Sequence, residues 1–206
     1  MQRHAMKKIT RFFLILLGCA LAAGCATRSE PSALYDFGPL RTDYVNSSKA
    51  GVLPPLSMAE INAPAWLDSQ LMYFRLSYAN RQQTRPYANS RWSMPPAQLF
   101  GQRLKARIAQ AGGVVLSATD GAAGLPLLRL DADDMMQNFD SASHSTVQLS
   151  VRATVLSGRS PLAQKTFSRQ ALAPSADAAG GAAALAAASD ALIDDMLLWL
   201  AGLPGK

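Results

Sequence analysis

Cysteine and histidine are scarce in this sequence, and their positions restrict the chemistry it can perform. The 206 residues contain two cysteines and two histidines. Both cysteines, Cys19 and Cys25, lie near the start, so the rest of the chain cannot form an internal disulfide. His144 is the single histidine after Cys25, and a lone histidine in a serine-rich turn is usually solvated.

Sequence motifs for phosphate binding, metal binding or nucleophilic catalysis are also missing. There is no Gly-rich phosphate loop, no His-x-x-x-His pair and no Gly-x-Ser-x-Gly elbow. Asp131, Asp133 and Asp134 could share a hard cation, but calcium loops need a glycine and further oxygen ligands, so an exposed strand face is the favoured interpretation. We therefore expect a protein that is not an enzyme, with no catalytic residues, no cofactor and no metal site.

Acidic residues are absent from one long stretch, between Asp68 and Asp120. Seven basic residues occur in that stretch: Arg75, Arg81, Arg85, Arg91, Arg103, Lys105 and Arg107. They either pair with the acids of the second half inside the fold or form a basic face for lipid headgroups or an acidic partner. Because a hairpin tip lies on the surface, we predict that Arg81 and Arg85, in the polar turn 80–85, are free to bind a partner.

The most distinctive apolar stretch, Phe12–Cys25, is too short to span a bilayer, which takes about 20 apolar residues. Four basic residues precede it, and small residues lead up to Gly24 and Cys25. A basic head, a short apolar centre and a small-residue exit are typical of a secretory signal peptide.

The end of this segment, Leu21-Ala22-Ala23-Gly24-Cys25, resembles a bacterial lipobox, in which the cysteine is acylated and becomes the mature N-terminus. It departs from the usual pattern because its leucine lies four residues before the cysteine rather than three. Cys19 is a competing candidate, but the bulky Leu17 and the short apolar core before it favour Cys25. An ordinary signal peptide with a coincidental cysteine is the alternative. We predict lipidation at Cys25, and a membrane anchor held by its acyl chains.

These features divide the chain into a signal peptide at 1–24, a lipidated N-terminus and tether at 25–33, and one domain at 34–206. The 182 residues from Cys25 onward are enough for one hydrophobic core. Four of the 20 basic residues and none of the 14 acidic ones precede Cys25, so the mature chain carries a charge of +2. That charge does not favour nucleic acid as a partner. Ala26, where an inner-membrane lipoprotein would be expected to carry Asp, favours the outer membrane by resemblance to lipoprotein sorting rules.

Alternating and helical patterns predict an α/β protein: a single two-layer domain with a mixed or antiparallel sheet covered by about two main helices. Strands are expected at 34–40, 56–61, 71–78, 86–92, 114–117, 127–139, 146–156 and 162–172. Helices are expected at 95–111 and 182–201, with a linker at 174–181. In the first helix, Arg103, Lys105 and Arg107 are expected mainly opposite the apolar stripe. Trp92, just before that helix, is expected to pack against the sheet.

The order of these features resembles the ABC-type transport auxiliary lipoprotein family, which contains the PqiC-like lipoproteins. The matching stretches are Tyr35–Pro39, Leu56–Ile61 with Pro64–Asp68, Leu71–Arg75, and Arg91-Trp92 followed by the helix at 95–111. The resemblance implies an outer-membrane lipoprotein facing the periplasm. It would be an accessory of systems in which an ABC transporter and an MCE (mammalian cell entry) protein move lipids across the envelope. It implies neither catalytic residues nor a small-molecule substrate. A scaffolding or assembly lipoprotein of another outer-membrane or cell-wall complex is the alternative.

Overall fold

The computed structural model describes residues 31–40, 51–121 and 123–203. The described residues from Ser32 onward belong to one compact unit. The strands are β1 (Ala33–Tyr35), β2 (Leu56–Met58), β3 (Leu71–Leu76), β4 (Thr84–Trp92), β5 (Val115–Ser117), β6 (Leu127–Phe139), β7 (Ser145–Ser157) and β8 (Ser160–Leu172). The helices are α2 (Pro96–Gln110) and α3 (Ala178–Ala201), with a short 3-10 helix at Ala118–Asp120.

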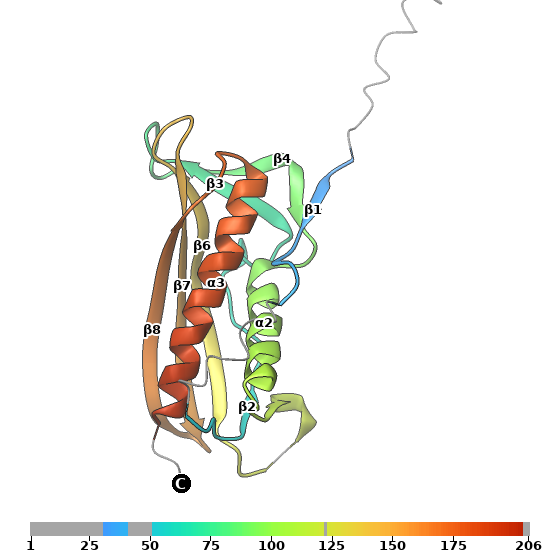
Figure 1. The fold of residues 1–206 in the computed structure, drawn as a ribbon, viewed down its shortest axis with the longest axis vertical. Coiled ribbons are helices and arrows are strands. Elements are labelled where there is room, and N and C mark those ends of the chain that lie inside the picture. Colours follow the sequence, from blue (N-terminus) through green and yellow to red (C-terminus); the bar gives the residue numbers. More distant parts are fainter. Residues whose placement is uncertain (1–30, 41–50, 122, 204–206) are drawn as a thin grey trace, which may run out of the picture. The chain divides into compact units, whose positions relative to one another are not determined.

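The sheet is built around β6 (Figure 1). One side of β6 pairs antiparallel with β7 along its whole length. The other side is shared, because β2 pairs parallel with its start and β3 pairs parallel with its end. β5 extends the sheet from β2, β4 and β1 extend it from β3, and β8 extends it from β7. The predicted α/β fold with a mixed sheet and two main helices is confirmed for the described residues.

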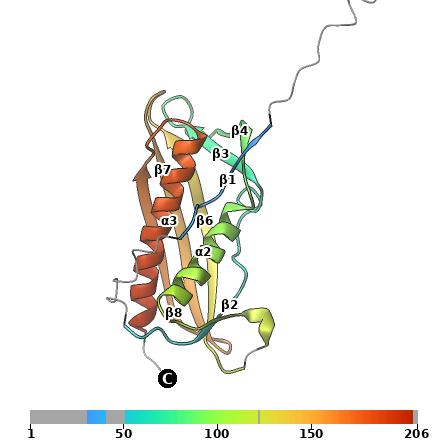
Figure 2. The same cartoon turned by 45° about the vertical axis from the view of Figure 1, so that its right-hand side comes forward.

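The two helices lie next to each other in front of the sheet in both views (Figures 1 and 2). α3 contacts β7 and β8, whereas α2 contacts β5, β6 and α3. Alternate residues of β7, including Val147, Leu149 and Val151, are buried in the core. From the helices, Phe100 and Leu192 are fully buried in the same cluster. The alternation of buried residues along β7 is the one expected of a strand with one covered face.

Several predicted elements have different ends in the structure. The first strand stops at Tyr35, because the Asp36 carboxylate accepts the backbone N–H of Gly38 at 2.7 Å and Gly38 has φ of 67°. That left-handed conformation turns the chain and costs a glycine little. β2 ends at Met58 rather than at Ile61, and β4 begins two residues earlier than predicted. The strand predicted at 127–139 has the expected bounds.

The last helix begins at Ala178, so the linker predicted at 174–181 extends too far. Asp177 is its N-cap, and the Asp177 carboxylate accepts the N–H of Gly180 at 2.7 Å. A Cβ at Gly181 would overlap the Gln137 carboxamide, so this turn of the helix approaches β6 too closely for a side chain. Glycines that indicate a linker by composition therefore serve here as a point of close packing.

We predict that Asp177→Ala lowers the free energy of unfolding by about 0.5–2 kcal/mol, because it removes this cap. The Gly180 N–H and the Ser175 hydroxyl hold the pKa of Asp177 below its usual value. The cap therefore stabilises the fold above the pKa of an unfolded Asp and loses that effect as pH falls through the lower folded pKa. Urea unfolding at pH 7 and at acidic pH checks this. Asp177→Asn, which keeps a capping oxygen, should remain near wild type at pH 7, and equal stability of Asp177→Ala would contradict the prediction.

Candidate partner-binding site

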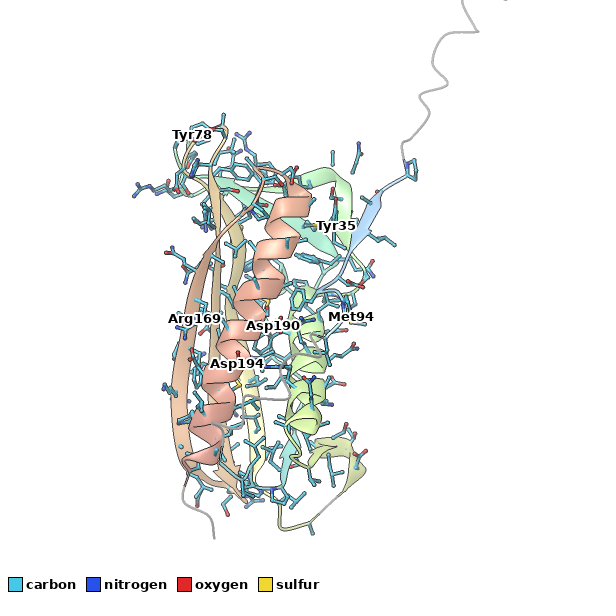
Figure 3. The ribbon with its side chains drawn as sticks, in the orientation of Figure 1. Tyr35, Tyr78, Met94, Arg169, Asp190 and Asp194 are labelled. Carbon is cyan, nitrogen blue, oxygen red and sulfur yellow. The ribbon has the colours of Figure 1, made fainter. Side chains whose placement is uncertain are left out.

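The tip of the β3–β4 hairpin is a defined turn on the surface. The Leu76 carbonyl accepts the N–H groups of Ala79 and Asn80 at 2.9 and 2.8 Å, and the Asn80 carboxamide accepts the Gln82 N–H at 3.0 Å. Tyr78 lies at this end of the sheet and is 52% exposed (Figure 3). These bonds satisfy the backbone locally and leave the side chains of the turn directed to solvent.

Arg81 and Arg85 are both exposed, as predicted from their place in a polar turn. Arg81 makes no hydrogen bond or ion pair with any residue that the structure describes. Arg85 donates from Nε and Nη2 to the Gln83 carboxamide oxygen, at 3.2 and 2.8 Å. This neutral partner orients the guanidinium without cancelling its charge. Binding of a partner by these two residues stays a prediction.

An aromatic cluster holds the hairpin against the sheet. The Phe74 ring of β3 lies 4.5 Å from Tyr87 of β4 and 5.6 Å from Phe139 of β6, centroid to centroid. Ring contacts of this kind stabilise a fold beyond the apolar area they bury. The Ser77 N–H also donates to the Phe139 carbonyl at 2.9 Å, just before the chain enters the turn. The hairpin tip therefore extends from a rigid base.

A polar network behind this cluster links four elements. The Tyr87 hydroxyl donates to Gln137 Oε1 at 2.9 Å, and Gln137 Nε2 donates to Ser145 Oγ at 2.9 Å and to the Asp177 carbonyl at 3.1 Å. Burial, with a smaller effect from the Asp177 charge, raises the pKa of Tyr87, so the hydroxyl stays protonated and remains a donor. The sequence contains no spacing that indicates this network, because its members come from distant parts of the chain.

The β6–β7 turn lies beside the hairpin tip at the same end of the sheet (Figure 1). It contains His144, whose side chain is exposed and whose carbonyl accepts the Asp140 N–H at 3.0 Å. Asp140 is exposed as well. In the described part of the chain, His144 has no side-chain hydrogen bond that would make it a base or a ligand.

Two of the seven basic residues lie in the interior, which corrects the prediction for the first helix. Arg103 and Arg107 are 7% and 4% exposed and face α3 rather than solvent. Arg103 forms a two-pronged ion pair with Asp190 at 2.6 and 2.7 Å, and Arg107 pairs with Asp194 at 2.5 Å (Figure 3). For Arg103 and Arg107, the alternative in which basic residues of the first half pair with acids of the second half inside the fold is therefore correct.

The other members of the stretch have polar partners of their own. Arg75 donates to the Asn138 carboxamide at 3.2 Å, Arg91 donates to the Tyr87 carbonyl at 2.6 Å, and Lys105 donates to the Ser117 hydroxyl at 3.2 Å. Arg81 and Arg85 are thus the members of this set whose charge is most open to solvent.

Two of the three β6 aspartates considered for a cation site, Asp131 and Asp133, contact the Arg152 side chain of β7. The Arg152 guanidinium lies 3.7 Å from Asp131 and 3.3 Å from Asp133, and Asn62 donates to Asp131 at 2.9 Å. Asp131 lies opposite Arg152 in the β6–β7 ladder, and Asp133 is the extra residue at the register shift between Ala132 and Asp134. Across residues 31–40, 51–121 and 123–203, no group of three or more His, Cys, Asp or Glu side chains could hold a metal ion.

A surface cleft of about 370 Å³ lies between α2 and the segment after β2. Its lining mixes charges of both signs, with Glu60 and Asp68 on one side and Lys105 on the other. Lys105 donates to Ser117, and Asp68 accepts from Gln98 at 3.4 Å. Lys105 and Asp68 are therefore each held by a neutral polar partner.

The family model for the ABC-type transport auxiliary lipoprotein component matches residues 39–197. The chain belongs to this family. Its function is therefore that of a transport auxiliary component, a role that does not call for catalysis. In the residues that the structure describes, neither helix combines the length and hydrophobicity needed to cross a membrane. Cys25, predicted to be the lipidated residue, lies outside the described residues.

Two crystal structures share the fold of this auxiliary lipoprotein. One is protein XCC0632 from Xanthomonas campestris, of the DUF330 family, with 16% identity and a TM-score of 0.63 over 82% of this chain and 91% of that one. The other is an uncharacterized protein with 13% identity and a TM-score of 0.63 over 82% of this chain and 97% of that one. No curated protein matches the chain.

Proposed function

We propose that this auxiliary lipoprotein is anchored in the outer membrane through Cys25 and docks, from the periplasm, onto a lipid transport system formed by an ABC transporter and an MCE protein. The observation that carries the proposal is the family match over residues 39–197. The signal-like segment at 1–24 and the lipobox-like sequence at Cys25 support the anchor. The absence of a membrane-crossing helix in the described residues is compatible with it.

The proposed mechanism is positional. Acyl chains on Cys25 would keep the domain at the membrane, since two or more chains hold a protein stably. The folded domain would then present its binding surface to the transport proteins. Neither nucleic acid nor a small-molecule substrate has a part in this mechanism.

Cys25→Ala is expected to release the protein from membranes or to leave it as the uncleaved precursor, because it removes the acceptor of the lipid. Fractionation of cells followed by mass spectrometry of the mature N-terminal peptide measures both effects. Cys19→Ala is the control and should leave the acylated Cys25 peptide unchanged. An acylated Cys19, or an unmodified Cys25 in wild type, would contradict the proposed anchor.

Charge reversal at the hairpin tip, Arg81→Glu with Arg85→Glu, is expected to weaken binding to the purified MCE-type partner most strongly at low salt. Exposed charges at the rim of an interface act mainly on the rate of encounter, and salt screens them. We expect a loss of about tenfold or more in association rate at low ionic strength, and a smaller loss at high salt. Surface plasmon resonance at two salt concentrations gives both values.

The matched control carries the same change of charge elsewhere. Arg129→Glu with Arg159→Glu also replaces two exposed arginines, in β6 and in the β7–β8 turn. This variant should bind nearly as well as wild type if the hairpin tip is the contact. Unchanged binding of the folded Arg81/Arg85 variant at low salt would exclude the tip. Equal losses in both variants would show a general effect of net charge.

A further inference from the structure

β8 is a long strand at the edge of the sheet. It has 13 residues and pairs with β7, and no other strand in the described ranges pairs with it. The strands at the other margins, β1 and β5, have three residues each. Of the β8 side chains, Phe167 alone is buried. A long exposed edge is a template for another strand, and proteins usually keep such edges short or block them.

The register shows which backbone groups of β8 are unpaired. The Ala173 N–H donates to the Ser145 carbonyl at 2.9 Å, and the two chains run antiparallel from there. In an antiparallel ladder, alternate residues face the neighbouring strand, so from Ala163 onward, after the register shift, the odd-numbered residues of β8 bond to β7. The even-numbered residues direct their N–H and C=O groups to the outside: Gln164, Thr166, Ser168, Gln170 and Leu172.

A shallow groove of about 530 Å³ runs along β8 on the side of α3. The Phe167 ring forms its floor and lies 5.6 Å from Trp199, and Leu198 is 49% exposed beside it. The Lys165 ammonium lies 5.0 Å over the Phe167 ring, and Arg169 is ion-paired with Asp195 of α3 (Figure 3). Apolar surface between two basic side chains therefore lies next to the unpaired backbone.

The charge of this edge indicates what it can bind. The segment Ser160–Leu172 contains no acidic residue, and its two charged side chains are Lys165 and Arg169. Asp195 of α3 also lines the groove and pairs with Arg169, so the charged side chains of the groove sum to one positive charge. An added strand would place alternate side chains in the groove, where carboxylates would lie near these cations and an apolar side chain near Phe167. A second copy of β8 is less suitable, because antiparallel pairing centred on Phe167 would set Lys165 opposite Arg169 of the other copy.

We propose that the free edge of β8 binds an extended segment of a partner protein by strand addition, with an apolar side chain flanked by carboxylates on the groove side. Backbone hydrogen bonds would supply the attachment, and the groove would select the side chains. This site is separate from the hairpin tip and does not depend on the identity of the transport partner.

Amide hydrogen exchange of the free domain gives the first test. The amides of Thr166, Ser168 and Gln170 should exchange at least tenfold faster than those of Phe167 and Arg169, because only the latter pair with β7. Uniform protection along β8 would show that the edge is already covered and would overturn the proposal. A dimer in sedimentation analysis with β8 protected would assign the edge to a second copy and overturn it as well.

Binding of a defined probe gives the second test. The probe is a blocked peptide, Thr-Glu-Thr-Leu-Thr-Glu-Thr, whose two Glu residues have the spacing of Lys165 and Arg169. We expect it to slow exchange at the outward-facing amides of β8 and to shift their NMR signals. A peptide with Lys in place of both Glu should bind at least fivefold more weakly. Equal binding of the two peptides, or signals shifted only elsewhere, would contradict the proposal.

Three protein variants separate backbone from side-chain effects. Thr166→Pro removes an outward N–H and keeps every N–H that faces β7, so the edge strand tolerates it. It should weaken the probe at least fivefold, whereas Thr166→Ala should bind like wild type. Lys165→Glu, which leaves the backbone intact, should weaken the Glu peptide and strengthen the Lys peptide. If Lys165→Glu does not reverse the preference for the Glu peptide over the Lys peptide, the proposed role of the groove is wrong. This result does not depend on whether the proline variant folds.

Discussion

Arg103→Met is expected to lower the free energy of unfolding by about 3–5 kcal/mol, because it leaves a largely buried carboxylate without its partner. The Asp190 side chain is 14% exposed and receives two hydrogen bonds from Arg103. Arg103 Nη1 also donates to the carbonyls of Phe37 and Gly38 at 2.9 and 3.0 Å. One guanidinium therefore joins the segment after β1 to both helices, and its loss affects all three.

A double-mutant cycle separates the ion pair from the carbonyl contacts. Arg103→Met with Asp190→Leu removes both charges, so the double variant should recover part of the lost stability while the two carbonyls still lack their donor. Lys105→Met removes a less buried cation from the same helix and should change stability by less than about 1 kcal/mol. Urea unfolding of wild type, Arg103→Met, Asp190→Leu, the double variant and Lys105→Met gives these values. Equal stability of Arg103→Met and Lys105→Met would show that the buried pair does not support the fold.

Trp92→Ala is expected to cost about 3–5 kcal/mol, the usual range for removing a buried tryptophan. Trp92 is 5% exposed, and its ring meets Phe37 edge-on with the centroids 5.8 Å apart. The predicted burial of Trp92 is confirmed, and the Phe37 ring is its aromatic partner. Because a domain has about 5–15 kcal/mol of stability in total, this loss should lower the melting temperature by several degrees or more.

Trp66→Ala is the matched control for this change. Trp66, in the turn before β3, is half-buried, and its ring centroid lies 6.2 Å from that of Tyr73. Its removal exposes less apolar surface, so the fall in melting temperature should be smaller. A thermal melt of Trp92→Ala that matches wild type would show that the Trp92 ring does not support the core. In that case its packing could not anchor the start of α2.

Local patterns were sufficient for most of the secondary structure. The alternation of β6 and the proline-started, glycine-ended α2 depend on neighbouring residues, which is why their bounds could be placed from sequence. The start of α3 could not, because the Asp177 cap lies in a run of small residues that also resembles a linker. Exposure of Arg81 and Arg85 followed from the turn residues around them.

The sequence by itself determined the α/β class, the family resemblance and the scarcity of catalytic groups, because each depends on residue type and local spacing. Helical spacing places Arg103 and Arg107 on the same face of α2 as Phe100, Leu104 and Ile108, so the expectation that they lie opposite the apolar stripe was wrong already at the level of the sequence. Only the tertiary structure decided which groups pair with them, because Asp190 and Asp194 come from α3, far along the chain. Whether β8 lies at the edge of the sheet likewise depends on which strands pair with one another. Pairing between distant segments is a property of the whole fold, so no local pattern could show it.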